Sequence, residues 1–161
     1  SLVLAGLDPT DLLLALEDLI AAERRSGDEF ATVCDLTIAP DLRSVCVRSA
    51  GHPPPVLAGR GALVDDARRA PLGVRLGPRD LPGTHHDLPA DWSLVAYTDG
   101  LFEVRSGDGV LAAEAVPPAV EAAAGRGGVD PDALIAAFAS LGAEGWRDDV
   151  AVIVISGRAG S

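Results

Sequence analysis

Two short apolar runs, far apart in the chain, each carry acidic residues at one end. Residues 92–97 (WSLVAY) are followed by Asp99, and residues 150–155 (VAVIVI) are preceded by Asp148 and Asp149. Both runs are short and rich in β-branched or aromatic residues, so we predict that each is a buried strand. If the two strands pair antiparallel, the C-terminal end of the first meets the N-terminal end of the second. Carboxylates distant in sequence then converge at one sheet edge.

Such a cluster of carboxylates is typical of a site for a hard divalent cation, Mg²⁺ or Mn²⁺. A bound cation would relieve the repulsion between Asp148 and Asp149. Because successive strand residues point to opposite faces, only one of these two should reach a given ion. Gly100 follows Asp99 and would let backbone or a hydrated ion approach closely. Each motif alone is also compatible with a solvated turn, so the metal site depends on the two strands being neighbours.

The remaining pattern predicts an α+β domain with antiparallel pairing rather than alternating βαβ units. Asp8 and Pro9 are suited to the N-cap and first position of the first helix. The composition of residues 65–82 indicates an exposed loop. The predicted elements are a helix at 9–25, strands at 30–38, 44–50, 56–57, 62–64, 84–88 and 92–97, helices at 117–124 and 131–141, and a strand at 150–155.

Charge and cysteine content narrow the functional classes. The chain has 13 basic residues, all Arg, and 24 acidic ones, for a net charge of −11. This balance disfavours nucleic acid, whose phosphates require a basic face. No apolar run approaches the ~18 residues of a membrane span. Cys34 and Cys46 fit neither a zinc site nor a disulfide scaffold, so we expect buried reduced thiols and a cytoplasmic protein.

The three histidines offer weaker signals. His52 stands between Gly51 and three prolines. It is suited to general-acid or metal-ligand chemistry, but the interpretation we favour is a structural histidine bonded to backbone. His85 and His86 have no third ligand at a suitable spacing and should be surface residues.

Five phrases in a fixed order carry a family resemblance. They are FAT at 30–32, SAGHPPP at 49–55, PLG at 71–73, LVAYTDGLFE at 94–103 and DDVAV at 148–152. Each is common by itself, but together they span about residues 30–155 with compatible spacing. In this order they resemble the SpoIIE-like branch of the PP2C (PPM) serine/threonine protein phosphatases.

The resemblance implies an αββα sandwich of antiparallel sheets flanked by helices, with a two-metal Mn²⁺/Mg²⁺ site at one end. By motif matching, Asp99 and Asp148 would be metal ligands and Gly100 a backbone neighbour of the site. Asp149 stands where related enzymes often carry Asn, which makes it the weaker candidate ligand. The implied reaction is hydrolysis of phosphoserine or phosphothreonine on a phosphorylated anti-sigma-factor antagonist. Upstream sensory domains and a homodimer are compatible with such a bacterial regulator.

One part of the family pattern is missing. Another essential metal Asp of the family lies in an earlier Asp-Val-x-Gly-His/Lys-Gly phrase, which this sequence does not contain. We therefore expect residues 1–161 to be a single phosphatase-like domain that forms the C-terminal portion of a larger one. It would lack the N-terminal strands and a bridging metal ligand, and it would be inactive alone.

Two other functions compete with this one. The first is a phosphatase-like module that binds a partner without catalysis. The second is another Mg²⁺-dependent enzyme, such as a nucleotide hydrolase, which the absence of a P-loop-type glycine-rich loop disfavours.

Overall fold

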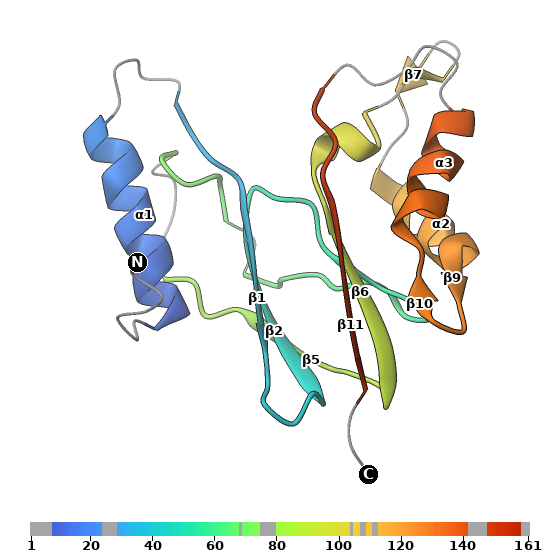
Figure 1. The fold of residues 1–161 in the computed structure, drawn as a ribbon. Coiled ribbons are helices and arrows are strands. Elements are labelled where there is room, and N and C mark those ends of the chain that lie inside the picture. The colour runs from blue at the N-terminus through green and yellow to red at the C-terminus, as the bar shows by residue number, and fades with distance from the viewer. Residues whose placement is uncertain are drawn as a thin grey trace.

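The computed structural model describes residues 8–23, 29–67, 69–74, 80–103, 105–106, 109–110, 113–141 and 148–158. Figure 1 labels most of the elements. In chain order they are α1 (Pro9–Glu23), β1 (Val33–Ile38), β2 (Ser44–Ala50), β3 (Val56–Leu57), β4 (Gly61–Ala62), β5 (Thr84–Asp87), β6 (Asp91–Tyr97), the 3₁₀ turn η2 (Asp99–Leu101), β7 (Arg105–Ser106), β8 (Gly109–Val110), η3 (Ala113–Ala115), α2 (Val116–Ala123), β9 (Ala124–Gly125), β10 (Gly128–Val129), α3 (Pro131–Leu141) and β11 (Val152–Arg158).

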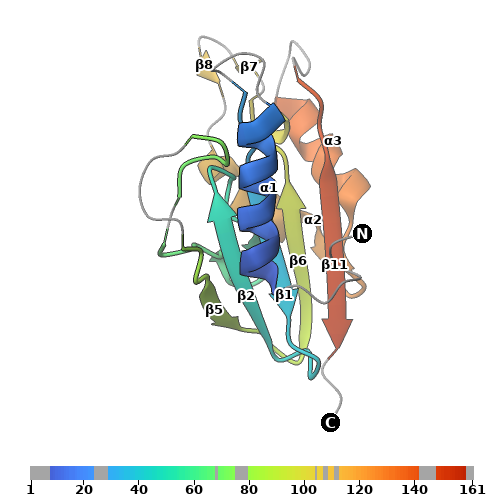
Figure 2. The same ribbon diagram turned by 90° about the vertical axis from the view of Figure 1, so that its left-hand side faces the viewer.

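Two sheets pack against each other, with helices on their outer faces. The first sheet has the order β1-β2-β5 and the second the order β11-β6-β3-β4. The ladders within both sheets are antiparallel. Helix α1 covers the first sheet, and α2 and α3 cover the second, as Figures 1 and 2 show. This αββα arrangement confirms the predicted fold class.

Strand β6 lies at the centre of the molecule and contributes to two cores. Leu94 belongs to the cluster between the two sheets, together with Val47 of β2. Val95, the next residue, belongs to the cluster that packs against α2 and α3, where Phe138 is fully buried. Because side chains alternate along a strand, covering both faces requires a nearly continuous apolar run. This explains why residues 92–97 show no apolar–polar alternation.

The second apolar run is less buried than predicted. Strand β11 begins at Val152, and its residues are half-buried or exposed, with Ile153 60% exposed. The reason is its position, because β11 is the edge strand of its sheet and pairs with β6 alone among the described strands. The apolar composition correctly predicted that this segment forms a strand. It did not reveal that, among the described strands, β11 has a neighbour on one side only.

The prediction of an exposed loop over residues 65–82 is wrong for several of its residues. Asp65, Leu72 and Leu81 are buried, with exposed fractions of 3%, 1% and 1%. Asp65 Oδ2 accepts a hydrogen bond from the backbone N–H of Ser49 at 2.9 Å. Its Oδ1 accepts one from the hydroxyl of Thr84 at 3.1 Å. The turn-rich local composition does not reveal these hydrogen bonds, because their partners are distant in the sequence.

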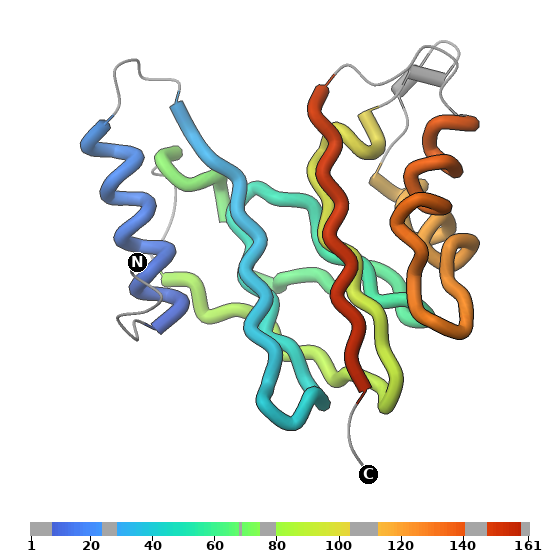
Figure 3. Tube along the Cα trace, viewed as in Figure 1, coloured from blue at the N-terminus to red at the C-terminus, as the bar shows by residue number. Residues whose placement is uncertain are grey.

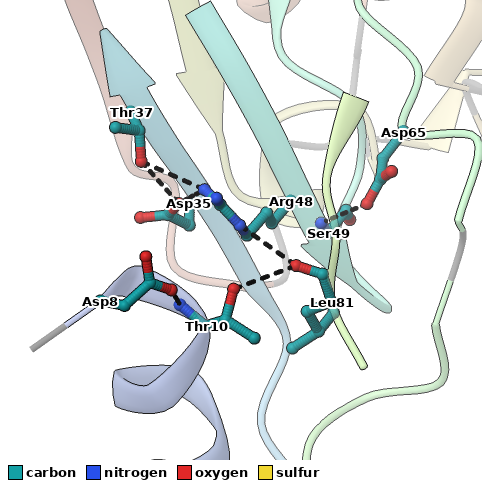
Figure 4. A network of polar contacts seen from close by, with 8 residues as sticks. All are labelled: Asp8, Thr10, Asp35, Thr37, Arg48, Ser49, Asp65 and Leu81. Carbon is teal, nitrogen blue, oxygen red and sulfur yellow. Dashed lines mark hydrogen bonds and ion pairs between the residues drawn. The ribbon is translucent and has the colours of Figure 1, made fainter. Parts of the chain in front are cut away.

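The same segment joins the first helix to the first sheet, as Figure 4 shows. The carbonyl oxygen of Leu81 accepts hydrogen bonds from Thr10 Oγ1 of α1 at 3.3 Å and from Arg48 Nε of β2 at 3.1 Å. Arg48 also forms an ion pair with Asp35 of β1 at 3.0 Å. One backbone carbonyl therefore ties α1 to β2.

The predicted N-cap of the first helix is confirmed, and Asp130 caps α3 in the same way. Asp8 Oδ1 accepts from the N–H of Thr10 at 2.8 Å, and Asp130 Oδ1 accepts from the N–H of Asp132 at 2.9 Å, as N-cap residues do. The predicted end of the first helix, near Arg25, lies outside the described residues. None of the described helices is long and apolar enough to cross a membrane.

Both cysteines are free thiols, as predicted, with Cys46 buried and Cys34 half-buried. Burial raises the pKa of the Cys34 thiol to about 11, and the neighbouring Asp35 carboxylate adds to the effect. A thiol with so high a pKa is a poor nucleophile at neutral pH. Of the adjacent histidines, His85 is exposed, whereas His86 is half-buried with Nε2 3.1 Å from the carbonyl oxygen of Val64.

Candidate metal centre

The antiparallel pairing of β6 and β11 brings the two acidic motifs together. Val152 lies opposite Tyr97 in the ladder, and Arg158 lies opposite Asp91 at the other end. Figure 3 shows the two strands side by side. Asp99, just after β6, and Asp148, just before β11, therefore stand at the same end of the sandwich. The predicted site required these two strands to be antiparallel neighbours, and the structure confirms that they are.

The segments that carry these acids are held together by hydrogen bonds beyond the ladder. The backbone N–H of Thr98 donates to the carbonyl of Ala151 at 3.0 Å. The Thr98 hydroxyl accepts from the N–H of Ala151 at 2.9 Å and donates to the carbonyl of Asp149 at 3.2 Å. Thr98 thus links the end of β6 to the residues before β11 through both its backbone and its side chain. The local sequence pattern gives Thr98 no such role, because its partners lie about fifty residues away in the chain.

Gly100 allows the closest approach between the two motifs. It is buried in the η2 turn, and a Cβ built there would lie 2.5 Å from the carbonyl oxygen of Asp149. Real Cβ atoms do not tolerate that distance, so any other residue would push the segments apart. Gly100 permits a close backbone approach, as expected, and the backbone that approaches it is that of Asp149.

We expect Gly100→Ala to destabilise the fold by about 1–3 kcal/mol, because the added methyl group forces a backbone shift. Denaturant unfolding monitored by Trp fluorescence measures the change. The matched control is Gly127→Ala, since a Cβ at Gly127 meets nothing within 4 Å. Equal stability of the two variants would contradict the close packing of Gly100 on Asp149.

The carboxylates themselves are accessible. Asp99, Asp148 and Asp149 are all exposed. Asp99 Oδ1 accepts from the N–H of Gly100 at 3.1 Å, and Asp148 Oδ1 accepts from the N–H of Asp149 at 2.8 Å. Each of these two side chains keeps a second oxygen without a hydrogen bond to any described residue. Such oxygens fit Mn²⁺ or Mg²⁺.

The described residues contain no group of three or more His, Cys, Asp or Glu side chains placed to hold one ion. Asp99 and Asp148 remain the candidate ligands that the sequence predicts at this end of the sandwich. Asp149 contributes its backbone carbonyl to the contacts described above, and no hydrogen bond fixes its carboxylate among the described residues.

His52 connects the first sheet to this end of β6. Its Nδ1 lies 3.1 Å from Thr32 Oγ1, and its ring also forms a hydrogen bond with the backbone of Tyr97. Burial lowers the pKa of His52, while the Tyr97 hydrogen bond and the Asp99 carboxylate act in the opposite direction. The bond to backbone agrees with the favoured interpretation. The contact with Thr32 follows from the antiparallel pairing of β1 and β2, in which Val33 lies opposite Ala50. The proximity of Asp99, at the end of β6, depends instead on how the two sheets pack.

Comparison with known proteins identifies relatives of the whole fold. The sequence profile described as Stage II sporulation protein E (SpoIIE) matches residues 1–158. No curated protein matches the chain significantly in sequence. The crystal structure of the RsbU and RsbW domains of Rv1364c from Mycobacterium tuberculosis aligns with a TM-score of 0.74 at 25% identity, over 98% of this chain and 44% of that one.

The phosphatase domain of the cell fate determinant SpoIIE from Bacillus subtilis has the same fold. Its Mn-presoaked form aligns with a TM-score of 0.62 at 16% identity, over 97% of this chain and 69% of that one. A second structure of that domain aligns with a TM-score of 0.57 at 18% identity, over 96% of this chain and 68% of that one. The present chain thus spans less than half of the Mycobacterium chain and about two thirds of the SpoIIE domain.

The profile match includes both acidic motifs and every element of the sandwich. The chain therefore belongs to the SpoIIE family, a branch of the PP2C-type phosphatases.

Proposed function

We propose that this chain is part of a metal-dependent serine/threonine protein phosphatase that acts in a bacterial regulator. The observation that carries the proposal is the convergence of Asp99 and Asp148 at one end of the sandwich, in a chain of the SpoIIE family. The substrate that we propose is a phosphorylated anti-sigma-factor antagonist. The RsbU and SpoIIE structural relatives support a role in sigma-factor regulation.

The proposed mechanism assigns separate tasks to the residues of this site. Asp99 and Asp148 would hold Mn²⁺ or Mg²⁺ through their exposed carboxylates. Such an ion, when bound, offsets charge on a phosphoryl group and makes water a better nucleophile at neutral pH. Thr98 and Gly100 keep the two acidic segments in contact, so that the ligands are positioned before the substrate arrives. Asp149 supports the site through its backbone and is the weaker candidate ligand.

We further propose that residues 1–161 form a single unit within a larger phosphatase domain. The open edge of β11 and the 69% coverage of the SpoIIE phosphatase structure support this. The free thiols are compatible with the cytoplasm, and the acidic charge disfavours nucleic acid as a partner. The alternative is a phosphatase-like module that binds a partner without catalysis. Both functions are compatible with the incomplete ligand set of the described residues, and the turnover of an extended chain distinguishes them.

Hydrolysis of p-nitrophenyl phosphate tests the proposal and its alternative. We expect no turnover by the 161-residue chain, because its ligand set is incomplete. A chain extended upstream to include an Asp-Val-x-Gly phrase should turn over only when Mn²⁺ or Mg²⁺ is present. Robust Mn²⁺-dependent turnover by the 161 residues alone would contradict the incomplete site. An extended chain that binds Mn²⁺ but hydrolyses neither this compound nor a phosphorylated anti-sigma-factor antagonist would favour the binding module.

A further inference from the structure

A cavity of about 530 Å³ lies at the end of the second sheet that is remote from the acidic motifs. Its walls are the start of β6, the end of β11 and the β9–β10 hairpin, which lies beside these strands in Figure 1. Trp92, which lines the cavity, and Tyr97, next to the candidate metal centre, are five positions apart along β6. At about 3.3 Å per strand residue, the two sites are roughly 17 Å apart. This volume is within the range of small-molecule sites, roughly 300–1,000 Å³.

A pair of serine hydroxyls lines the cavity. Ser93 of β6 and Ser156 of β11 lie opposite each other in the ladder, with their Oγ atoms 2.7 Å apart. One serine hydroxyl donates its proton to the oxygen of the other. The proton of the accepting hydroxyl has no acceptor among the described residues. Gly128 closes over the pair, because a Cβ on it would lie 2.6 Å from Ser93 Oγ. The cavity therefore presents a hydrogen-bond donor beside the glycine-rich β9–β10 hairpin.

The charges at this cavity have the opposite sign to those of the chain as a whole. Two guanidinium groups line it, those of Arg126 on the hairpin and Arg158 at the end of β11. Asp91 is the acidic residue of the lining, and it is ion-paired with Arg158. Arg126 is exposed and forms no ion pair with any described residue. One uncompensated cation thus stands at this cavity in a protein of net charge −11.

We propose that this cavity binds a small organic phosphate. The exposed Arg126 guanidinium and the available serine proton are groups that bind phosphate oxygens. The cavity is larger than a bare phosphate needs, and Ala58 and Ala124 line it with small apolar side chains that an organic substituent can contact. The site is separate from the proposed metal centre and does not depend on it.

The test uses phenylphosphonate, whose C–P bond a phosphatase cannot hydrolyse, and inorganic phosphate, in the presence of EDTA and at constant ionic strength. Binding is followed by amide NMR of the ¹⁵N-labelled chain. We expect shifts in the amide signals of Gly125, Gly127 and Gly128, with phenylphosphonate binding more tightly than inorganic phosphate. Equal affinity for inorganic phosphate would assign the free anion as the ligand of the same site.

Two substitutions of Gly127 separate the effect of side-chain charge on binding from the effect of side-chain shape. A side chain at Gly127 enters open space, so Gly127→Asp and Gly127→Asn should both fold. We expect Gly127→Asp to weaken binding tenfold or more, and Gly127→Asn to change it little. Arg126→Gln should also cost about tenfold, because it removes a charge-assisted hydrogen bond. Arg60→Gln should leave the affinity for phenylphosphonate unchanged, because Arg60 lies on another glycine-flanked turn and does not line the cavity.

Two results would overturn the proposal. One is the absence of shifts at the hairpin glycines with either anion at millimolar concentration. The other is equal binding by the Asp and Asn variants of Gly127 together with unchanged binding by Arg126→Gln. Thermal unfolding of each variant verifies that a loss of binding does not reflect a loss of fold.

Discussion

Asp99→Asn, in a chain extended upstream to complete the ligand set, is expected to lower Mn²⁺-dependent phosphatase turnover at least a hundredfold. Replacing residues that only orient metal ligands typically costs about 10–100-fold in metal affinity or activity, and a direct ligand should cost at least as much. Asn preserves the shape of Asp and can still accept the hydrogen bond from the N–H of Gly100. The fold should therefore be unchanged, and Asp148→Asn should behave in the same way.

Asp149→Asn is the matched control. It removes a neighbouring exposed charge, but it leaves the carbonyl that accepts from Thr98 in place. We expect this variant to retain most of its turnover and its Mn²⁺ affinity, measured by titration of the metal in the activity assay and by calorimetry. Wild-type turnover in both Asp99→Asn and Asp148→Asn would remove the metal assignment. If Asp149→Asn lost as much turnover as Asp99→Asn and Asp148→Asn, all three carboxylates would be assigned as metal ligands.

Glu17→Leu is expected to produce the largest loss of stability, about 3–5 kcal/mol, or roughly 6–20 °C in Tm. Glu17 of α1 and Arg69 form an ion pair whose side chains are only 2% and 6% exposed. Arg69 Nη2 lies 3.3 Å from both carboxylate oxygens of Glu17, and its Nη1 is buried with no hydrogen-bond partner in the described part of the chain. Removing Glu17 leaves a buried guanidinium without its counter-ion.

A double variant separates the ion pair from the packing of α1. Glu17→Leu combined with Arg69→Met removes both charges and keeps apolar volume, so it should be much more stable than Glu17→Leu alone. Urea unfolding of the wild type, both single variants and the double variant completes the cycle. A double variant as unstable as the Glu17→Leu single variant would show that the charges do not carry the effect.

Much of this molecule is predictable from local pattern. The order of helices and strands along the chain, the N-cap Asp8 and the helix at Pro131–Leu141 follow from periodicity and turn chemistry. These features depend on residues within a few positions of one another. The convergence of Asp99 and Asp148 is also predictable, because antiparallel pairing of two apolar runs brings those ends together.

The errors occur where long-range contacts decide burial. Residues 65–82 have the composition of a solvated loop, yet Asp65 and Leu81 are buried because their partners lie on β2, β5 and α1. Strand β11 has the composition of a central strand, yet among the described strands it pairs with β6 alone. The buried pair of Glu17 and Arg69 was not foreseen either, since a charge near a helix face is normally solvated.

By itself, the sequence determined which segments form strands and helices, which residues carry carboxylates at strand ends, and which family the chain resembles. Those properties depend on local side-chain chemistry and on motif order. The tertiary structure alone decided that Gly100 packs on Asp149, that His52 joins Thr32 to Tyr97 beside Asp99, and that the Ser93–Ser156 pair lies beneath a glycine hairpin. Each of these depends on distances between residues that are remote in the chain, and such distances are set by how sheets and helices pack rather than by any local pattern.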